Sequence, residues 1–392
     1  MSAVNEAIVR EKHRMIPGLL REAGVDAWLV LTREDCDPTL PLILPSHLVM
    51  DTAFIFTPLG STALIGHISV ASGHGRYFDK TIDYTPGKLE DVLRPVLQEL
   101  DPKVLALNFS ESDYTADGLS HGFFRRLVNA MGQEWVSSRM ASAEDIVSQF
   151  RAVKSPTEIS LIEEAARITV KVATEMNPLI QAGMTHGELQ DLFRRTVLSD
   201  GRSEPEFFIA TSGCIGKILR GDPDYRVEPG DSLILDIGVR YEGYASDYKR
   251  MWYFLEEGQD QPPDDLVRAF NTVRDVIKES AVNCVPGKIG YEVNARALAR
   301  MTEAGYDEFQ HALGHGVGRA VHDGGVTLGR KERYRRASSV IKPNMVFTLE
   351  PGIKMPNHYP VSIEEVCVTR DSGPARLFVS PQDYLYLVPA TR

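Results

Sequence analysis

The apolar and polar positions of the chain follow different patterns before and after about residue 150. In the first part, short apolar runs at residues 27–32 and 53–57 alternate with segments of helical periodicity at residues 4–23 and 89–100. Buried strands that alternate with amphipathic helices are typical of an α/β domain. We therefore expect residues 1–150 to form a small N-terminal α/β domain without a ligand cluster of its own.

A helix-start signal marks the beginning of the second part. Ser155 at the N-cap, Pro156 at the first helical position and Glu158 at the third form a capping box. We expect a second domain over residues 151–392. Its patterns predict helices near residues 156–179, 186–199, 263–282 and 291–304, and strands near 207–211, 362–369, 376–380 and 384–388.

Two apolar strands, each carrying one aspartate, predict a hairpin with a tight turn at Glu242-Gly243. A two-residue loop pairs Asp236 with Lys249, and Asp247 lies two residues before Lys249. Because side chains alternate between the faces of a strand, both aspartates project from the same face. Carboxylates this close repel each other unless one is protonated or a cation lies between them. A metal ion is the simplest resolution, although two surface aspartates beside a turn would give the same pattern.

Composition and charge narrow the class of protein. The 392 residues are 43% hydrophobic and 25% charged, which is typical of a globular protein with two domains. A formal net charge of −11 argues against non-specific nucleic-acid binding, which needs a basic surface. No signal peptide, transmembrane segment or CxxC pair is recognisable. We expect a cytoplasmic protein with reduced cysteines and with neither a membrane nor a nucleic-acid partner.

Further candidate ligands lie in the second domain. The histidines His311, His315 and His322 fall within twelve residues, and the glycines beside His315 allow close approach to its imidazole. Glu350 ends an apolar strand where Pro351-Gly352 breaks it. Each of these residues alone is more often structural or solvated, so the argument depends on the whole set.

One more carboxylate comes from Glu364 or Glu365, which point to opposite faces of a strand. Apolar periodicity does not choose between them. With either one, the chain offers four strand-borne carboxylates and one Gly-flanked histidine. Two divalent cations would neutralise four carboxylates, and these donors suit Mn, Co or Zn. Two such ions about 3.5–4 Å apart can hold a shared hydroxide and polarise a scissile carbonyl.

The order and spacing of these residues resemble the ligand series of the pita-bread metallopeptidases. That superfamily includes methionine aminopeptidase, aminopeptidase P, prolidase (Xaa-Pro dipeptidase) and creatinase, and the Xaa-Pro dipeptidase branch is the most similar. The resemblance is strong over about residues 151–390, and residues 151–158 are similar to the domain junction of Xaa-Pro peptidases. The residues that carry it are Asp236, Asp247, Gly314, His315, Gly316, Val317, Gly318, His322, Glu350, Pro351, Gly352, Ile363, Glu364 and Glu365.

The resemblance implies an α/β fold of two domains. Residues 1–150 would form a creatinase/prolidase-like α/β domain. Residues 151–392 would form the pita-bread catalytic domain, in which helices cover a pseudo-two-fold antiparallel sheet. Relatives are commonly homodimers, so a homodimer is also implied.

A dinuclear metal centre follows from the same resemblance. Asp247 and Glu364 would bridge two divalent ions, and Glu364 is selected over Glu365 because the superfamily uses the first acid of this step. The implied ions are Mn, Co or Zn, and the implied metal ligands are Asp236, Asp247, His315, Glu350 and Glu364.

Catalytic roles are implied as well. A hydroxide between the ions would attack the amide carbonyl, and Glu350 would move the proton. His322 would hydrogen-bond the substrate or the tetrahedral intermediate, and His311 would line the pocket.

Three departures from the superfamily pattern concern substrate recognition. A substrate-contacting histidine is replaced near Leu219, next to Arg220. An arginine is replaced by Ser362. The Asn-x-x-Tyr-Leu-Thr-Gly pattern of the N-terminal domain is absent, and residues 35–50 with three prolines stand in its place.

Three functions fit this sequence. The first is a dinuclear metal-dependent peptidase that hydrolyses Xaa-Pro dipeptides or N-terminal Xaa-Pro bonds. The second is a hydrolase or lyase of a small non-peptide molecule, as in creatinase or ectoine hydrolase. The third is a binding module on a retired peptidase scaffold. The complete ligand set favours the first, and His322 argues against the third.

Overall fold

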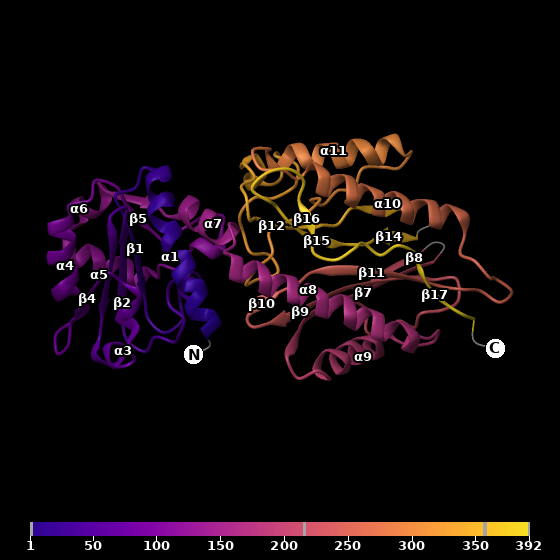
Figure 1. Ribbon diagram of the computed structural model, residues 1–392, viewed down its shortest axis with the longest axis horizontal. Coiled ribbons are helices and arrows are strands. Elements are labelled where there is room, and N and C mark those ends of the chain that lie inside the picture. The colour runs from indigo at the N-terminus through magenta and orange to yellow at the C-terminus, as the bar shows by residue number, and fades with distance from the viewer. Residues whose placement is uncertain (1–2, 215–216, 356–358, 391–392) are drawn as a thin grey trace. The chain divides into compact units, whose positions relative to one another are not determined.

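The computed structural model describes residues 3–214, 217–355 and 359–390, which form two units, Met1–Arg151 and Ala152–Arg392 (Figure 1). A mixed six-stranded sheet lies at the centre of the first unit, in the order β4-β3-β2-β1-β5-β6. All six residues of β1 are buried, in agreement with its apolar sequence. The strands are β1 (Ala27–Thr32), β2 (Thr52–Thr57), β3 (Gly60–Ile65), β4 (Lys80–Asp83), β5 (Leu105–Leu107) and β6 (Met140–Ser142).

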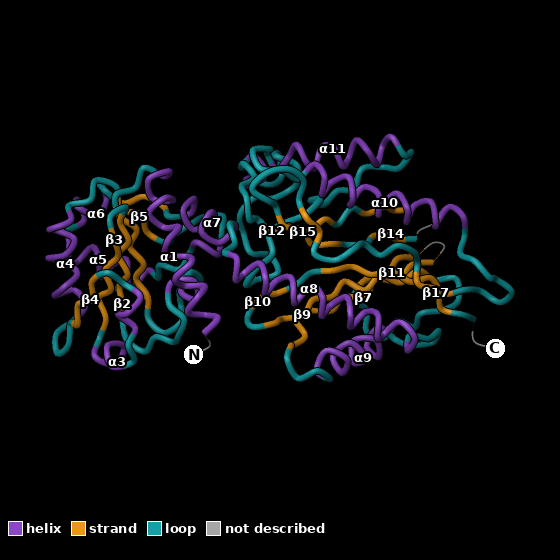
Figure 2. The backbone as a smooth tube through the Cα atoms, in the orientation of Figure 1, coloured by secondary structure: helices purple, strands orange, loops and turns teal. Residues whose placement is uncertain are grey.

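Helices flank this sheet (Figure 2). Leu93 of α4 and Leu127 of α5 pack in one core cluster with Leu29 of β1. Trp28, the residue before Leu29 in β1, contacts Phe150 edge to face, with ring centroids 5.5 Å apart. Successive residues of β1 therefore reach two different layers of the core. The helices are α1 (Ala3–Ala23), α2 (Leu40–Ile43), α3 (His67–Ala71), α4 (Leu89–Leu100), α5 (His121–Met131), α6 (Gln133–Ser137) and α7 (Glu144–Ala152).

The second unit is built on a sheet with the strand order β17-β11-β9-β7-β8, and β10 also pairs with β9. Two smaller sheets, β12-β15-β16 and β13-β14, lie beside it (Figure 1). The strands are β7 (Ser203–Cys214), β8 (Lys217–Arg220), β9 (Ser232–Tyr241), β10 (Tyr244–Ala245), β11 (Tyr248–Phe254), β12 (Val346–Leu349), β13 (Gly352–Lys354), β14 (Pro360–Ser362), β15 (Glu365–Val368), β16 (Arg376–Leu377) and β17 (Tyr386–Val388).

Four long helices cover these sheets, two on each side (Figure 2). Phe193 of α9 and Leu235 of β9 share a core cluster with apolar residues of α8. Phe270 of α10 and Met301 of α11 share another with Phe347 of β12. The helices are α8 (Pro156–Met176), α9 (His186–Leu198), α10 (Asp264–Asn283) and α11 (Gly290–Glu303). Of the described helices, none combines the length and the apolar character needed to cross a membrane.

The predicted capping box opens α8. The Ser155 hydroxyl accepts from the Glu158 amide at 3.3 Å, and the Glu158 carboxylate accepts from the Ser155 amide at 2.8 Å. Pro156 occupies the first turn, where its missing N–H leaves no intrahelical bond unmade. The helix start predicted from the sequence is therefore confirmed.

The predicted hairpin register is also confirmed. Tyr241 pairs with Tyr244 across a two-residue loop. Positive φ angles of 47° at Glu242 and 82° at Gly243 are those of a type I′ turn, whose twist matches that of the flanking strands. Further along, Lys249 pairs with Asp236, which fixes the face on which every side chain of β11 lies.

The single strand predicted at residues 362–369 is wrong. Ser362 ends β14, which pairs with β13, whereas Glu365 begins β15, which pairs with β12. Between them the chain leaves both ladders, and the amide of Glu364 donates instead to the carbonyl of Lys249 at 3.3 Å. Glu364 is therefore fixed at the point where the chain passes from one sheet to another.

Candidate metal centre

The segment that carries His315 is held by close backbone contacts to β12. The His315 amide donates to the Thr348 hydroxyl at 3.1 Å. A Cβ placed on Gly314 would lie 1.9 Å from the Thr348 carbonyl oxygen, and one on Gly316 would lie 2.5 Å from the Gly324 carbonyl oxygen. Glycine is therefore required on both sides of His315, because a side chain at either position would push the imidazole away from the hairpin.

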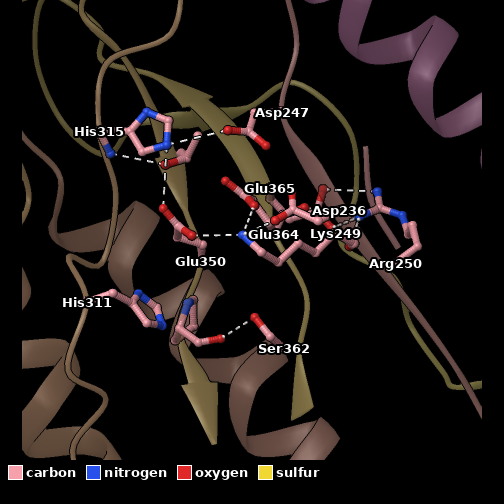
Figure 3. A network of polar contacts seen from close by, with 12 residues as sticks. Asp236, Asp247, Lys249, Arg250, His311, His315, Glu350, Ser362, Glu364 and Glu365 are labelled. Atoms are coloured by element: carbon pink, nitrogen blue, oxygen red, sulfur yellow. Dashed lines mark hydrogen bonds and ion pairs between the residues drawn. The ribbon is translucent and has the colours of Figure 1, made fainter. Parts of the chain in front are cut away.

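Three of the predicted ligands form a group that could hold a metal ion. Ligand atoms of Asp247, His315 and Glu364 all lie within 4.8 Å of one another (Figure 3). The Nε2 atom of His315 is 3.4 Å from Asp247 Oδ2 and 3.5 Å from Glu350 Oε1. Residues that are up to 117 positions apart in the sequence thus place oxygen and imidazole donors around one point.

Unpartnered oxygens support the assignment of a cation to this group. Among the described residues, Asp247 Oδ1 and Glu364 Oε1 are buried and have no hydrogen-bond partner. A buried carboxylate oxygen without a partner is costly, and a divalent cation would compensate it. Carboxylate and imidazole donors suit Mn, Co or Zn, so these residues fit a divalent ion.

Lys249 lies among the same carboxylates, and we did not assign it a role from the sequence. Its ammonium contacts Glu350 Oε2 at 2.8 Å, Glu364 Oε2, and Asp236 Oδ2 at 3.6 Å (Figure 3). Burial alone would lower the pKa of Lys249, but the charges of Glu364, Glu350 and Asp236 raise that pKa well above its ordinary value. The predicted register already placed Lys249 opposite Asp236, so the signal was present in the sequence.

Asp236 is placed differently from the other predicted ligands. Its Oδ2 atom lies 3.6 Å from Lys249 Nζ and 3.6 Å from a guanidinium nitrogen of Arg220. Burial raises the pKa of Asp236 to about 6, although Lys249 opposes this shift. Asp236 thus has two cationic side chains as its nearest charged partners.

The pKa values of Glu364 and Glu350 are shifted in opposite directions, although burial raises both. Burial and the charge of Asp247 raise the pKa of Glu364 well above its ordinary value. Burial would also raise the pKa of Glu350, but Lys249 and His315 lower it overall. Burial alone would lower the pKa of His315, but contact with Asp247 raises it. The carboxylates therefore compete for a limited amount of positive charge.

The two other predicted histidines line the same pocket, which has a volume of about 1060 Å³. The His322 ring centroid is 4.3 Å from that of His315, and burial together with the charge of His315 lowers the pKa of His322. His311 stacks on Phe309 at 5.1 Å. Arg220 also lines the pocket, beside the position where the superfamily histidine is replaced.

Glu365, the alternative to Glu364, lies outside this cluster. Its carboxylate forms an ion pair with Arg250 at 2.9 Å and also accepts from the Gln382 amide at 3.3 Å. Glu364 and Glu365 are both fully buried, so their exposure does not distinguish them. The cation that each glutamate contacts does distinguish them: Lys249 for Glu364 and Arg250 for Glu365. Lys249 and Arg250 leave β11 on opposite faces.

Comparisons with known proteins show which proteins the chain is similar to. The sequence pattern of metallopeptidase family M24 matches residues 160–371. The chain is 31% identical over 258 residues to the uncharacterized peptidase YqhT of Bacillus subtilis, which covers 64% of this chain and 69% of that protein. It is 27% identical over 317 residues to an Xaa-Pro dipeptidase of Pyrococcus horikoshii, which covers 80% of this chain and 86% of that protein.

A solved structure is similar over nearly the full length. The X-Pro aminopeptidase of Thermotoga maritima superposes with a TM-score of 0.69 at 25% sequence identity, and the match covers 96% of this chain and 99% of that chain.

Proposed function

The chain belongs to metallopeptidase family M24, and we propose that it hydrolyses the amide bond of Xaa-Pro dipeptides or of N-terminal Xaa-Pro sequences. Membership of this family makes it a metal-dependent hydrolase. The Xaa-Pro specificity is inferred from the relatives, two of which are described as an Xaa-Pro dipeptidase and an X-Pro aminopeptidase. The observation that carries the proposal is the Asp247–His315–Glu364 group, of which Asp247 and His315 line a pocket.

The unit Ala152–Arg392 would be the catalytic domain, since it contains every predicted ligand. Asp247, His315 and Glu364 would hold a divalent ion, with Glu350 as a further ligand. In the dinuclear arrangement implied by the resemblance, Asp236 would complete a second ion position. Bound divalent ions would supply an activated water molecule and would polarise the scissile carbonyl.

Side chains of the pocket would complete the reaction. The Glu350 carboxylate would accept a proton from the attacking water and pass it to the leaving nitrogen. His322, whose ring lies beside that of His315, would donate a hydrogen bond to the oxygen that develops negative charge. His311, which lines the pocket on its stacked Phe309, would limit the space for the substrate.

The test is hydrolysis of a substrate panel by metal-free protein supplied separately with Mn, Co and Zn. The panel contains Xaa-Pro dipeptides, Xaa-Pro tripeptides, creatine and ectoine. Release of the first amino acid from the peptides, release of urea from creatine and consumption of ectoine are measured. We expect metal-dependent release from an Xaa-Pro substrate, with Mn the most effective ion. The variant Asp247→Asn, purified in the same way, controls for contaminating peptidases.

Other outcomes identify the alternatives. Turnover of creatine or ectoine alone would contradict Xaa-Pro hydrolysis and support a non-peptide substrate. Absence of both turnover and bound metal would support a binding module. The homodimer and the cytoplasmic location stay predictions, and light scattering of the purified protein and fractionation of cells would test them.

A further inference from the structure

The position of Lys249 follows from the backbone. Lys249 is two residues after Asp247, so both side chains leave the chain on the same face. It is also the direct partner of Asp236 in the β9–β11 ladder. With 12% of its side chain exposed, Lys249 has its ammonium directed into the cluster of acids by the register itself.

In both Glu350 and Glu364, one carboxylate oxygen contacts the Lys249 ammonium and the other does not. Glu364 turns Oε2 to the ammonium, and its Oε1 is a buried oxygen without a hydrogen-bond partner among the described residues. Glu350 turns Oε2 to the ammonium at 2.8 Å, while its Oε1 lies 3.5 Å from His315 Nε2. The cluster thus contains one position taken by a lysine and one position lined by oxygens and an imidazole.

Charge neutrality distinguishes one ion from two. The four acids Asp236, Asp247, Glu350 and Glu364 carry four negative charges when ionised. Lys249 and Arg220 contribute one positive charge each, and both lie 3.6 Å from Asp236 Oδ2. One divalent cation then completes neutrality, whereas two would leave a surplus of two positive charges beside a buried ammonium.

We propose that the Lys249 ammonium takes the place of one of the two divalent cations, so that the centre binds a single ion at Asp247, His315, Glu350 and Glu364. The inference rests on the proposed function only in that the chain uses a divalent metal. Asp236 then serves as an ion-pair partner of Lys249 and Arg220 and does not bind metal. The ammonium of Lys249 would hold the two glutamates in place as a second metal otherwise would.

Metal counting tests this proposal without reference to activity. Protein stripped with a chelator is dialysed against increasing MnCl₂, bound Mn is counted per chain by plasma mass spectrometry, and the electron paramagnetic resonance spectrum is recorded. We expect one Mn in the wild type, with the spectrum of an isolated ion. In Lys249→Ala we expect two, with the spectrum of a spin-coupled pair. Lys171→Ala, which removes an exposed lysine of α8, should keep one.

A second variant that retains Lys249 keeps the proposal testable if Lys249→Ala does not fold. Asp236→Asn should still bind one Mn, because Asp236 is not a ligand in this arrangement. Two Mn in the wild type, or loss of one Mn in Asp236→Asn, would overturn the proposal. One Mn in a folded Lys249→Ala, or none in any variant, would overturn it too.

These results are independent of the substrate panel. One Mn per chain without Xaa-Pro hydrolysis would leave the lysine assignment standing and refute the proposed substrate. Two coupled Mn ions in the wild type, together with Xaa-Pro hydrolysis, would refute the lysine assignment and leave the proposed substrate standing.

Discussion

Strand β11 presents two buried cation–carboxylate arrangements on its two faces. On one face Lys249 contacts Glu364, and on the other Arg250 contacts Glu365 (Figure 3). Lys249 and Arg250 are adjacent in the sequence, and so are Glu364 and Glu365. The same two segments of the chain therefore supply both ion pairs. The faces differ in how charge and hydrogen bonds are balanced.

The Arg250 face is closed. Arg250 and Glu365 are both buried, and the guanidinium also donates to the Lys249 carbonyl at 2.9 Å and to the Glu364 carbonyl at 3.1 Å. One cation meets one carboxylate, with further bonds to the backbone and to Gln382. Such a pair fixes the two segments to each other and offers nothing to a ligand.

The Lys249 face has a surplus of carboxylates, and it opens into a pocket. Two carboxylate oxygens on this face, and the Nε atom of Arg250 on the other, lack hydrogen-bond partners among the described residues. The faces therefore differ in charge: a balanced ion pair indicates a structural role, whereas an excess of acids around one cation indicates a place for a second cation. Four substitutions test this distinction.

The largest effect is expected for Asp247→Asn. Loss of this carboxylate should release the bound metal and lower turnover by about 10³-fold or more, because a Lewis acid contributes several kcal/mol to the transition state. The thermal midpoint of the stripped protein should stay close to that of the wild type. Near wild-type turnover of this variant with Mn present would refute the metal centre.

On the closed face, Arg250→Met should act on stability. Breaking a buried pair leaves Glu365 uncompensated and should lower the free energy of unfolding by about 3–5 kcal/mol, measured by urea denaturation. The folded fraction should still bind Mn. Adding Glu365→Leu should recover much of the loss, since the orphaned charge is then removed. Loss of Mn without loss of stability would mean that the two faces have been assigned the wrong way round.

His322→Ala probes the wall of the pocket beyond the ligands. Removing a hydrogen bond to the developing negative charge should lower kcat by about 10²-fold. Bound Mn per chain should be the same as in the wild type, because His322 is not assigned to the ion. An equal fall in metal content and in kcat would instead make His322 a ligand.

The smallest effect concerns the turn that both faces share. Glu242 has a positive φ of 47°, and asparagine adopts this conformation more readily. Glu242→Asn should raise the free energy of unfolding by about 0.5 kcal/mol, because the left-handed conformation costs less for asparagine. Metal content and kcat should not change. A change in either would show that the turn acts on one face more than on the other.

The sequence was most informative where a short-range rule applies. A two-residue loop at Glu242-Gly243 determines every pair of the hairpin, so the pairing of Asp236 with Lys249 could be predicted. The capping box at Ser155 is equally local. The fold class was predicted from the resemblance, and the structural match to the aminopeptidase over nearly the whole chain confirms it.

Other features could not be obtained in this way. Residues 361–368 read V-S-I-E-E-V-C-V, and the apolar residues on both sides of Glu364-Glu365 are typical of a strand, so the change of sheet between them was not predicted. Apolar periodicity could not choose between Glu364 and Glu365, because each is fully buried beside its own cation. The role of Lys249 was missed because only metal-binding residue types were counted, although the register had placed an ammonium among them.

The turn at Glu242-Gly243 also limits how this hairpin can change over evolution. Adding or removing one residue there would either create a bulge or exchange the two faces of β11. In the second case, removal would place Arg250 where Lys249 now lies, and addition would place Tyr248 there. Changes of two residues would preserve the faces. The length of this loop, whose residues do not line the pocket, should therefore vary among descendants of this chain in even steps, or together with a bulge, as long as the lysine and its acids are retained.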